Sequence, residues 1–264
     1  MPTIVSGVRK LNEIIENVYV TVIMSVYNDE NNLSIAIESI LNQSHENTIL
    51  FIVDDGSTDG TRNIIHNYSK KYSNIRCLYN DQNLGLASCL NQALKLVDTE
   101  YIARMDSDDF SYPDRLHKQL KYMIENPHIE VLGTSADFID SNGSLMTIIK
   151  PTSFQEIKKN IEFVNPFVHS SVMMRKTFID NIGGYDNKLR KAQDLDLWYR
   201  GISNNNYANL PDVLVRYSLK KQNIYLLLYG FRVRVINAWR RKRFFIGLTK
   251  AILVLIHGLY KSIR

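Results

Sequence analysis

Short apolar runs alternate with helical stretches from residue 19 to about residue 109, at a spacing of about 25 to 30 residues. The apolar runs are rich in β-branched and aromatic residues, as strands are: Tyr19 to Val26, Ile49 to Val53, Ile75 to Tyr79 and Tyr101 to Met105. The stretches between them have helical apolar spacing: Glu30 to Gln43, Thr61 to Tyr72 and Leu86 to Val97. Strands that alternate with helices form βαβ units, so the sequence predicts an α/β fold with a parallel sheet.

The second half of the chain has a different pattern. A helix is expected after Pro113, followed by two apolar runs on either side of the Asn142-Gly143 pair, which is typical of a hairpin turn. The runs are Ile129 to Ile139 and Leu145 to Ile149, and further elements are expected at Phe167 to Met174 (strand), Asp194 to Ser203 (helix) and Val213 to Ser218 (strand). A hairpin within the sheet makes the predicted sheet mixed rather than purely parallel.

The composition excludes several classes of protein. The chain has 264 residues, of which 45% are hydrophobic and 22% charged, which excludes a disordered or collagen-like chain. Cys77 and Cys89 are too few for a disulfide framework and are expected to be thiols in a reducing compartment. Glu13 and Glu16 interrupt the place where a signal peptide would be apolar, so we expect no secretion signal.

The charge is divided unevenly along the chain. Residues 216–264 hold twelve Lys or Arg and no Asp or Glu, whereas the preceding residues hold 20 basic and 27 acidic side chains, a net charge of −7. A basic tail on an acidic body suggests an anionic partner for the tail, either a phospholipid surface or nucleic acid.

Ligands of such sheets bind beyond the carboxyl ends of the strands, where this chain carries carboxylates. Asp54 and Asp55 follow the second apolar run. They fit either a capped turn or a site that accepts hydrogen bonds from a base or a ribose. The spacing leaves both readings open.

A second acidic group, Asp106, Asp108 and Asp109, follows the fourth apolar run. Three carboxylates within four residues repel one another unless a cation or bound protons offset the repulsion. Mg²⁺ and Mn²⁺ prefer such oxygen ligands, completed by water and substrate phosphates. The alternative is a solvated acidic turn.

Five ordered motifs resemble those of glycosyltransferase family 2. They run Thr21 to Asn28 (TVIMSVYN), Val53 to Thr61 (VDDGSTDGT), Asn83 to Ala87 (NLGLA), Tyr101 to Asp109 (YIARMDSDD) and Ala192 to Trp198 (AQDLDLW). The resemblance covers about residues 19 to 218. It implies a GT-A fold, in which a nucleotide-binding α/β half is fused to an acceptor-binding half, and inverting transfer of a sugar from a nucleotide diphosphate.

The resemblance also implies roles for individual residues. Ser25, Tyr27 and Asp55 would hold the base of the nucleotide, most often uracil. Asp108 would be the more direct ligand of Mn²⁺ or Mg²⁺, with Asp106 nearer the ribose. The general base would be Asp194, although from the sequence alone this carboxylate is equally a favourable charge at a helix N-terminus.

Two further residues have two readings each. His169 either touches the acceptor or the diphosphate, or is structural. Arg104 either approaches the diphosphate or pairs with the neighbouring Asp cluster. No Gln-x-x-Arg-Trp follows Asp194, and relatives that polymerise processively usually have that motif, so one sugar is expected per encounter.

The tail is expected to contain amphipathic helices. In a helix, Arg243, Lys250, His257 and Lys261 would fall within about 20° of one line and leave the remaining surface apolar. This pattern favours a helix lying in a membrane interface, supported by Arg240, Arg241, Lys242, Arg243 and Lys250. A helix packed on the body and a short membrane span are the alternatives.

The expected organisation is an N-terminal extension (1–18), a catalytic domain (19–218, divided near residue 110) and a membrane-associating tail (219–264). A lipid-linked glycan acceptor, such as a polyprenyl diphosphate-linked oligosaccharide at the cytoplasmic face of a bacterial membrane, would suit this arrangement. Two rivals remain. A pyrophosphorylase would have a Gly-rich loop where this chain has Ser25 to Glu30, and a membrane- or nucleic-acid-binding protein on the same scaffold would have no transferase activity.

Overall fold

The computed structural model describes residues 11–140, 142–203, 206–219, 224–240 and 244–263. After a helix at residues 11–17, the first half alternates strands and helices as expected. Its elements are β1 (Val20–Val26), α2 (Leu33–Leu41), β2 (Thr48–Asp54), α3 (Thr61–Lys71), β3 (Ile75–Tyr79), α4 (Leu86–Leu96) and β4 (Tyr101–Asp106). All four strands are mutually parallel, which confirms the βαβ pattern.

The second half adds shorter and more varied elements. They are β5 (Phe110–Ser111), α5 (Arg115–Glu125), β6 (Val131–Ile139), β7 (Leu145–Ile148), α6 (Phe154–Asn160), the 3-10 helix η1 (His169–Ser171), β8 (Met173–Arg175), α7 (Lys176–Ile182), α8 (Gln193–Gly201) and β9 (Tyr207–Ser218). The expected hairpin across Asn142-Gly143 is confirmed, because β6 and β7 pair antiparallel.

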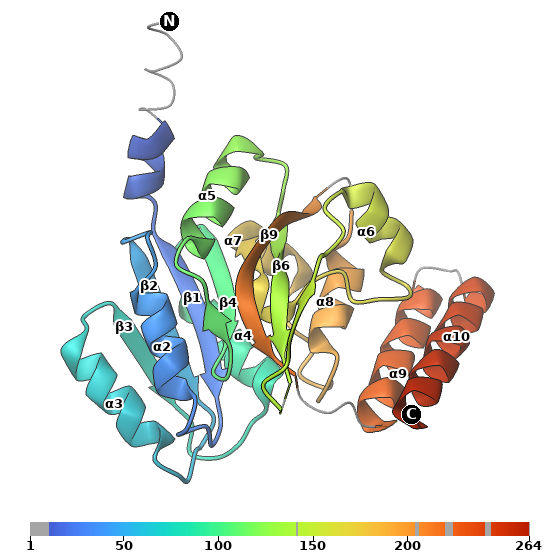
Figure 1. Ribbon diagram of the computed structural model, residues 1–264, viewed down its shortest axis with the longest axis horizontal. Helices are drawn as coiled ribbons and strands as arrows, with labels where there is room; N and C mark the ends of the chain where they lie inside the picture. The colour runs from blue at the N-terminus through green and yellow to red at the C-terminus, as the bar shows by residue number, and fades with distance from the viewer. Residues whose placement is uncertain (1–10, 141, 204–205, 220–223, 241–243, 264) are drawn as a thin grey trace, which may run out of the picture.

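One mixed sheet joins both halves. Its strand order is β3-β2-β1-β4-β8-β6-β9-β5, with β7 paired to β6, and β8 runs antiparallel to its neighbours β4 and β6. The carboxyl ends of β1, β2 and β4 therefore meet at one edge of the sheet (Figure 1). The domain boundaries expected at residues 110 and 218 stay predictions.

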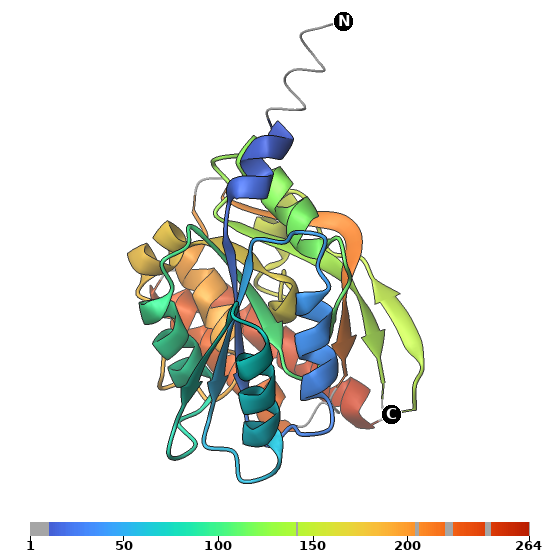
Figure 2. The ribbon, with the colours of Figure 1, turned by 90° about the vertical axis from the view of Figure 1, so that its left-hand side faces the viewer.

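Helices cover both faces of the sheet (Figure 2). Side chains of β1 alternate between two cores: Val22 and Met24 pack on one face, in the core that includes α2 and α5, and Ile23 packs on the other face with α4 and α8. All three of these side chains are fully buried. The period of two along the strand thus divides its apolar residues between the two helical layers.

The prediction of a strand at Phe167 to Met174 is mostly wrong. Residues 169–171 form η1, and only Met173–Arg175 pair as β8. The hydroxyls of Ser170 and Ser171 are fully buried and need partners, and the turn supplies them, since Ser171 Oγ donates to the Val168 carbonyl at 2.8 Å.

The last strand begins six residues earlier than expected. β9 starts at Tyr207, and its register against β6 shifts between Thr134 and Ala136, opposite Pro211 and Asp212. This irregularity interrupts the alternation of apolar and polar residues along the strand. The sequence therefore predicted only the part of the strand from Val213 onward.

The tail forms a helical hairpin of α9 (Ile224–Arg240) and α10 (Phe244–Ile263), as expected of its C-terminal helices. Two glycines of α10 allow close packing on α9: a Cβ at Gly247 would lie 2.2 Å from the Ala238 Cβ, and one at Gly258 would lie 2.6 Å from Leu227 Cδ2. Within the described part of the chain, no helix has both the length and the apolarity needed to cross a bilayer.

Candidate active site

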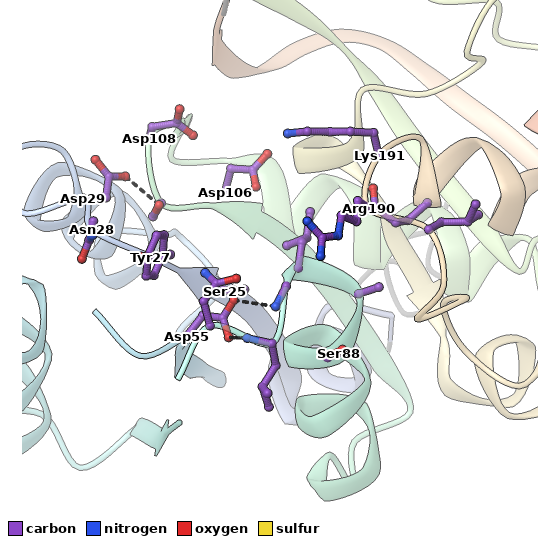
Figure 3. A pocket seen from close by; sticks show the side chains of 18 of the residues that line it. Ser25, Tyr27, Asn28, Asp29, Asp55, Ser88, Asp106, Asp108, Arg190 and Lys191 are labelled. Carbon is purple, nitrogen blue, oxygen red and sulfur yellow. Dashed lines mark hydrogen bonds between the residues drawn. The ribbon is translucent and has the colours of Figure 1, made fainter. Parts of the chain in front are cut away.

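A cavity of about 790 Å³ lies at the carboxyl ends of β1, β2 and β4 (Figure 3). One wall comes from these strand ends and carries the expected residues Ser25, Tyr27, Asp55, Asp106 and Asp108. The other wall comes from the N-terminus of α4 and from the loop before α8. The parallel sheet therefore brings together residues more than 80 positions apart, because equivalent strand ends share one edge.

Asp55 is a buried carboxylate that holds the loop before α4. It is 3% exposed, and its oxygens accept hydrogen bonds from the backbone N–H groups of Leu84 at 2.7 Å and Gly85 at 2.9 Å. Tyr27 also lines the cavity and is 48% exposed. Asp55 thus shapes the cavity as well as lining it.

Asp106, Asp108 and Asp109 each offer one oxygen, and these oxygens all lie within 4.8 Å of one another. Of these three carboxylates, only those of Asp106 and Asp108 line the cavity. Two carboxylates facing a polar cavity fit a hard divalent cation that takes its remaining ligands from water and phosphate.

Asp109 points away from the cavity. It is 3% exposed, accepts a hydrogen bond from the Ser170 hydroxyl, and accepts another from the Ser218 backbone N–H at 2.8 Å. Burial, together with the charges of Asp106 and Asp108, raises the pKa of Asp109 to about 8. The raised pKa reflects a carboxyl enclosed by the protein, whose two hydrogen bonds brace the loop.

Arg104 pairs with the Asp cluster, which is one of its two expected roles, and contact with a diphosphate stays a prediction. It is 1% exposed, forms an ion pair with Asp106, and donates to Ser170 Oγ at 2.7 Å. Burial would raise the pKa of Asp106, but the adjacent guanidinium outweighs burial and holds that pKa below its usual range. Asp106 is therefore ionised at neutral pH even without a metal.

Asp194 lies in the first turn of α8 and is not among the residues that line the cavity, although the preceding residue, Gln193, is. One of its oxygens accepts a hydrogen bond from the Asn165 amide. Ala192, just before the helix, adopts a left-handed conformation with φ +57°. A non-glycine residue in this region is strained, so tertiary contacts must hold the turn that carries Asp194.

His169 is bound to a tyrosine beside the site. Its Nε2 lies 2.8 Å from the Tyr185 hydroxyl, and His169 is not among the residues that line the cavity. Burial, with the nearby positive charge of Arg104, lowers the pKa of His169 to about 4, so the ring is neutral at pH 7. This geometry favours the structural reading of His169.

Arg190 and Lys191 are the functional candidates that sequence reasoning missed. Both line the cavity from the loop before α8 and extend toward the carboxylate wall (Figure 3). The signal was the basic run Lys188 to Lys191 immediately before the motif that contains Asp194. One wall of the cavity is thus acidic and the other basic.

The expected membrane residues of the tail lie partly against the body. Arg240 donates to Asp196 Oδ1 at 3.0 Å, and Lys250 forms an ion pair with Glu162. Arg241, Lys242 and Arg243 lie outside the described residues. A membrane role for the tail stays a prediction.

Comparisons with known proteins agree with this geometry. The family description "Glycosyl transferase family 2" matches residues 21–183. An uncharacterised glycosyltransferase of Methanocaldococcus jannaschii is 34% identical over 86% of this chain and 81% of its own length. The O-antigen biosynthesis glycosyltransferase WbnJ of Escherichia coli is 32% identical over 77% of this chain and 81% of its own.

Among solved structures, TarS 1–349 of S. aureus in complex with UDP-GlcNAc matches with a TM-score of 0.69. The match covers 84% of this chain and 66% of that chain at 22% identity, and it shows that the two share the GT-A fold. With the family match over more than half of its length and these relatives, the chain belongs to glycosyl transferase family 2.

Proposed function

We propose that this protein moves one sugar, with inversion, from a UDP-hexose or UDP-N-acetylhexosamine to a hydroxyl of a glycan acceptor. The single observation that carries the proposal is the cavity itself, in which an acidic wall at the strand ends faces Arg190, Lys191 and the start of α8. A nucleotide diphosphate matches such a divided cavity, because it binds a cation on one side and cationic side chains on the other.

Ser25, Tyr27, Asp55 and Asp106 are the proposed nucleotide-binding residues. Tyr27 offers an exposed ring for stacking, and carboxylates accept hydrogen bonds from a uracil N–H or a ribose hydroxyl. Asp108, with Asp106, would hold Mn²⁺ or Mg²⁺, which neutralises the diphosphate leaving group as a Lewis acid. Asp106 is already paired with Arg104.

Arg190 and Lys191 would bind the diphosphate from the opposite wall. As the bond between the anomeric carbon and the diphosphate oxygen breaks, negative charge accumulates on that oxygen. Cationic groups already in place stabilise this charge without reorganisation, which lowers the barrier.

Asp194 is the proposed general base. The acceptor hydroxyl oxygen forms a bond to the anomeric carbon, its proton passes to Asp194, and the nucleoside diphosphate leaves on the opposite face. One in-line displacement inverts the anomeric centre and needs only one base. The Asn165 amide, which donates to Asp194, fixes the direction of the carboxylate.

The proposed acceptor is a polyprenyl diphosphate-linked oligosaccharide at the cytoplasmic face of a bacterial membrane, in surface polysaccharide synthesis. Support comes from the O-antigen function in the name of WbnJ and from the tail, which has twelve basic and no acidic residues from 216 onward. Exposed apolar side chains of the hairpin suit a lipid interface: Leu228, Trp239, Ile252, Leu253 and Ile256.

The test is release of nucleoside diphosphate from a panel of UDP-, GDP- and dTDP-sugars. Wild type and Asp108→Ala are assayed with Mn²⁺ or Mg²⁺ and a membrane extract as the source of acceptor. Metal-dependent turnover of a UDP-sugar that Asp108→Ala abolishes is the expected result. No release by folded wild type, in an extract that supports a known transferase, would contradict the proposal.

The basic tail also supports a second candidate, a membrane- or nucleic-acid-binding protein without transferase activity. Flotation with anionic liposomes and retardation of DNA, compared at matched salt, separate the two partners. Lipid binding is expected, because apolar residues accompany the basic ones.

A further inference from the structure

We propose that α9 is a positioning element for Asp194, and that Arg234, Asn237 and Arg240 are its positioning residues. The inference rests on the proposed role of Asp194 as the base. Two separate elements place this carboxylate: α8 carries it, and the segment at residues 162–165 carries Asn165, which donates to it. The helix α9 binds both.

The contact with α8 is made through Asp196, two residues beyond the base. Asp196 is 2% exposed, and its Oδ1 accepts hydrogen bonds from Asn237 Nδ2 at 3.1 Å and Arg240 Nη1 at 3.0 Å. Its Oδ2 accepts from Arg200 Nε at 2.7 Å, within α8 itself. A buried carboxylate held by three donors fixes the rotation of the helix about its axis.

The contact with the second element is made through its backbone. Arg234 donates from Nε to the Glu162 carbonyl at 3.0 Å and from Nη2 to the Phe163 carbonyl at 3.2 Å. Lys250 of α10 adds an ion pair with Glu162 and places its ammonium 5.2 Å from the centre of the Phe163 ring. These contacts lie two and three residues from Asn165.

The two contacts together act on the base from both sides. Val233 and Asn237 are 1% and 2% exposed, so one face of α9 is seated between α8 and the 162–165 segment. A displacement of α9 would move Asp194 relative to Asn165 and to the cavity. A shift of about 1 Å in a reacting group can reduce a rate by about 10²-fold, so small losses at this contact are expected to appear in kcat.

The experiment compares Arg240→Ala and Arg234→Ala with Arg232→Ala. Arg232 is an exposed residue of the same helix, and its removal changes the charge equally, while no hydrogen bond or ion pair of its side chain is found among the described residues. Transfer to a detergent-solubilised acceptor is measured, so that membrane attachment does not enter. We expect kcat to fall about 10-fold in the first two variants and to stay at the wild-type level in the control.

Three readouts separate positioning from mere anchoring. In Arg234→Ala and Arg240→Ala, the dissociation constant of UDP and the folded fraction should stay within about 2-fold of wild type. Arg240→Lys should recover part of kcat. In an Asp194→Asn background, Arg240→Ala should lower kcat no further. Wild-type kcat in folded Arg234→Ala and Arg240→Ala would overturn the inference. If these variants fail to fold, Arg240→Lys and Asp196→Asn give the same comparison.

The same set distinguishes this inference from the proposed function. Full kcat in Asp194→Asn would show that Asp194 is not the general base, which rejects that part of the proposed function. Loss of kcat in Asp194→Asn with full kcat in both arginine variants would leave the base in place and reject only the role of α9.

Discussion

Arg104 and Asp106, two residues apart at the end of β4, form an ion pair in which Asp106 lines the cavity and the arginine is almost completely buried. The pair means that the first carboxylate of the acidic cluster is compensated before any ligand arrives. Removal of the Arg104 guanidinium would leave the partly buried carboxylate of Asp106 without an opposite charge.

We therefore expect Arg104→Met to lower the free energy of unfolding by about 3 kcal/mol, since breaking a buried pair leaves one charge uncompensated. Urea denaturation monitored by circular dichroism measures the change. The matched control is Lys118→Met, which breaks the exposed pair with Asp212 and should change stability by less than about 1 kcal/mol. Equal effects in both variants would contradict the importance of burial.

The raised pKa of Asp109 predicts that the free energy of unfolding depends on pH. Its folded pKa of about 8 lies above the unfolded value, so the folded state binds the extra proton, and the stability present at low pH is lost as the pH rises toward 8. Asp109→Asn should remove this component. Unfolding at pH 5 and pH 8.5 with a chelator present checks the prediction, and identical pH profiles for the two proteins would contradict it.

Gly56, in the loop after β2, is expected to tolerate no side chain. Its φ is +75°, and a Cβ would lie 2.6 Å from the Gln82 carbonyl carbon. Gly143 has a similar φ of +81°, but apart from its chain neighbours no described residue has an atom within 4 Å of its Cβ position. Gly56→Ala should lower stability by about 3 kcal/mol and Gly143→Ala by about 1 kcal/mol, because only the first adds a clash to the strain. Thermal melts compare the two variants directly.

The basic wall should bind phosphate rather than the base. Arg190→Ala and Lys191→Ala are each expected to weaken UDP binding about 10-fold, the loss of one charge-assisted hydrogen bond, and to leave uridine binding unchanged. Isothermal calorimetry with UDP, UMP and uridine measures the difference. Lys188→Ala, in the same loop but outside the cavity lining, is the control. Equal weakening for uridine would place these side chains at the base instead.

The alternation of strands and helices in the first half was readable from the sequence, because the periods of apolar residues in strands and helices differ. The same reasoning placed Asp55, Asp106 and Asp108 at one cavity, since parallel strands end at one edge of the sheet. The β6–β7 hairpin was readable from its Asn-Gly turn.

Tertiary contacts decided the features that local sequence patterns do not contain. The 3-10 helix η1 at residues 169–171 places the buried Ser170 hydroxyl against a distant residue, because it donates to Asp109 and thereby holds that carboxyl away from the cavity. Arg240 meets Asp196 across 44 residues of sequence, and Lys250 meets Glu162 across 88. The sequence by itself thus determined which chemical groups stand at the ends of the strands. Which of them face the cavity, and which are neutralised within the protein, depended on burial and long-range pairing, which arise only when the chain is folded.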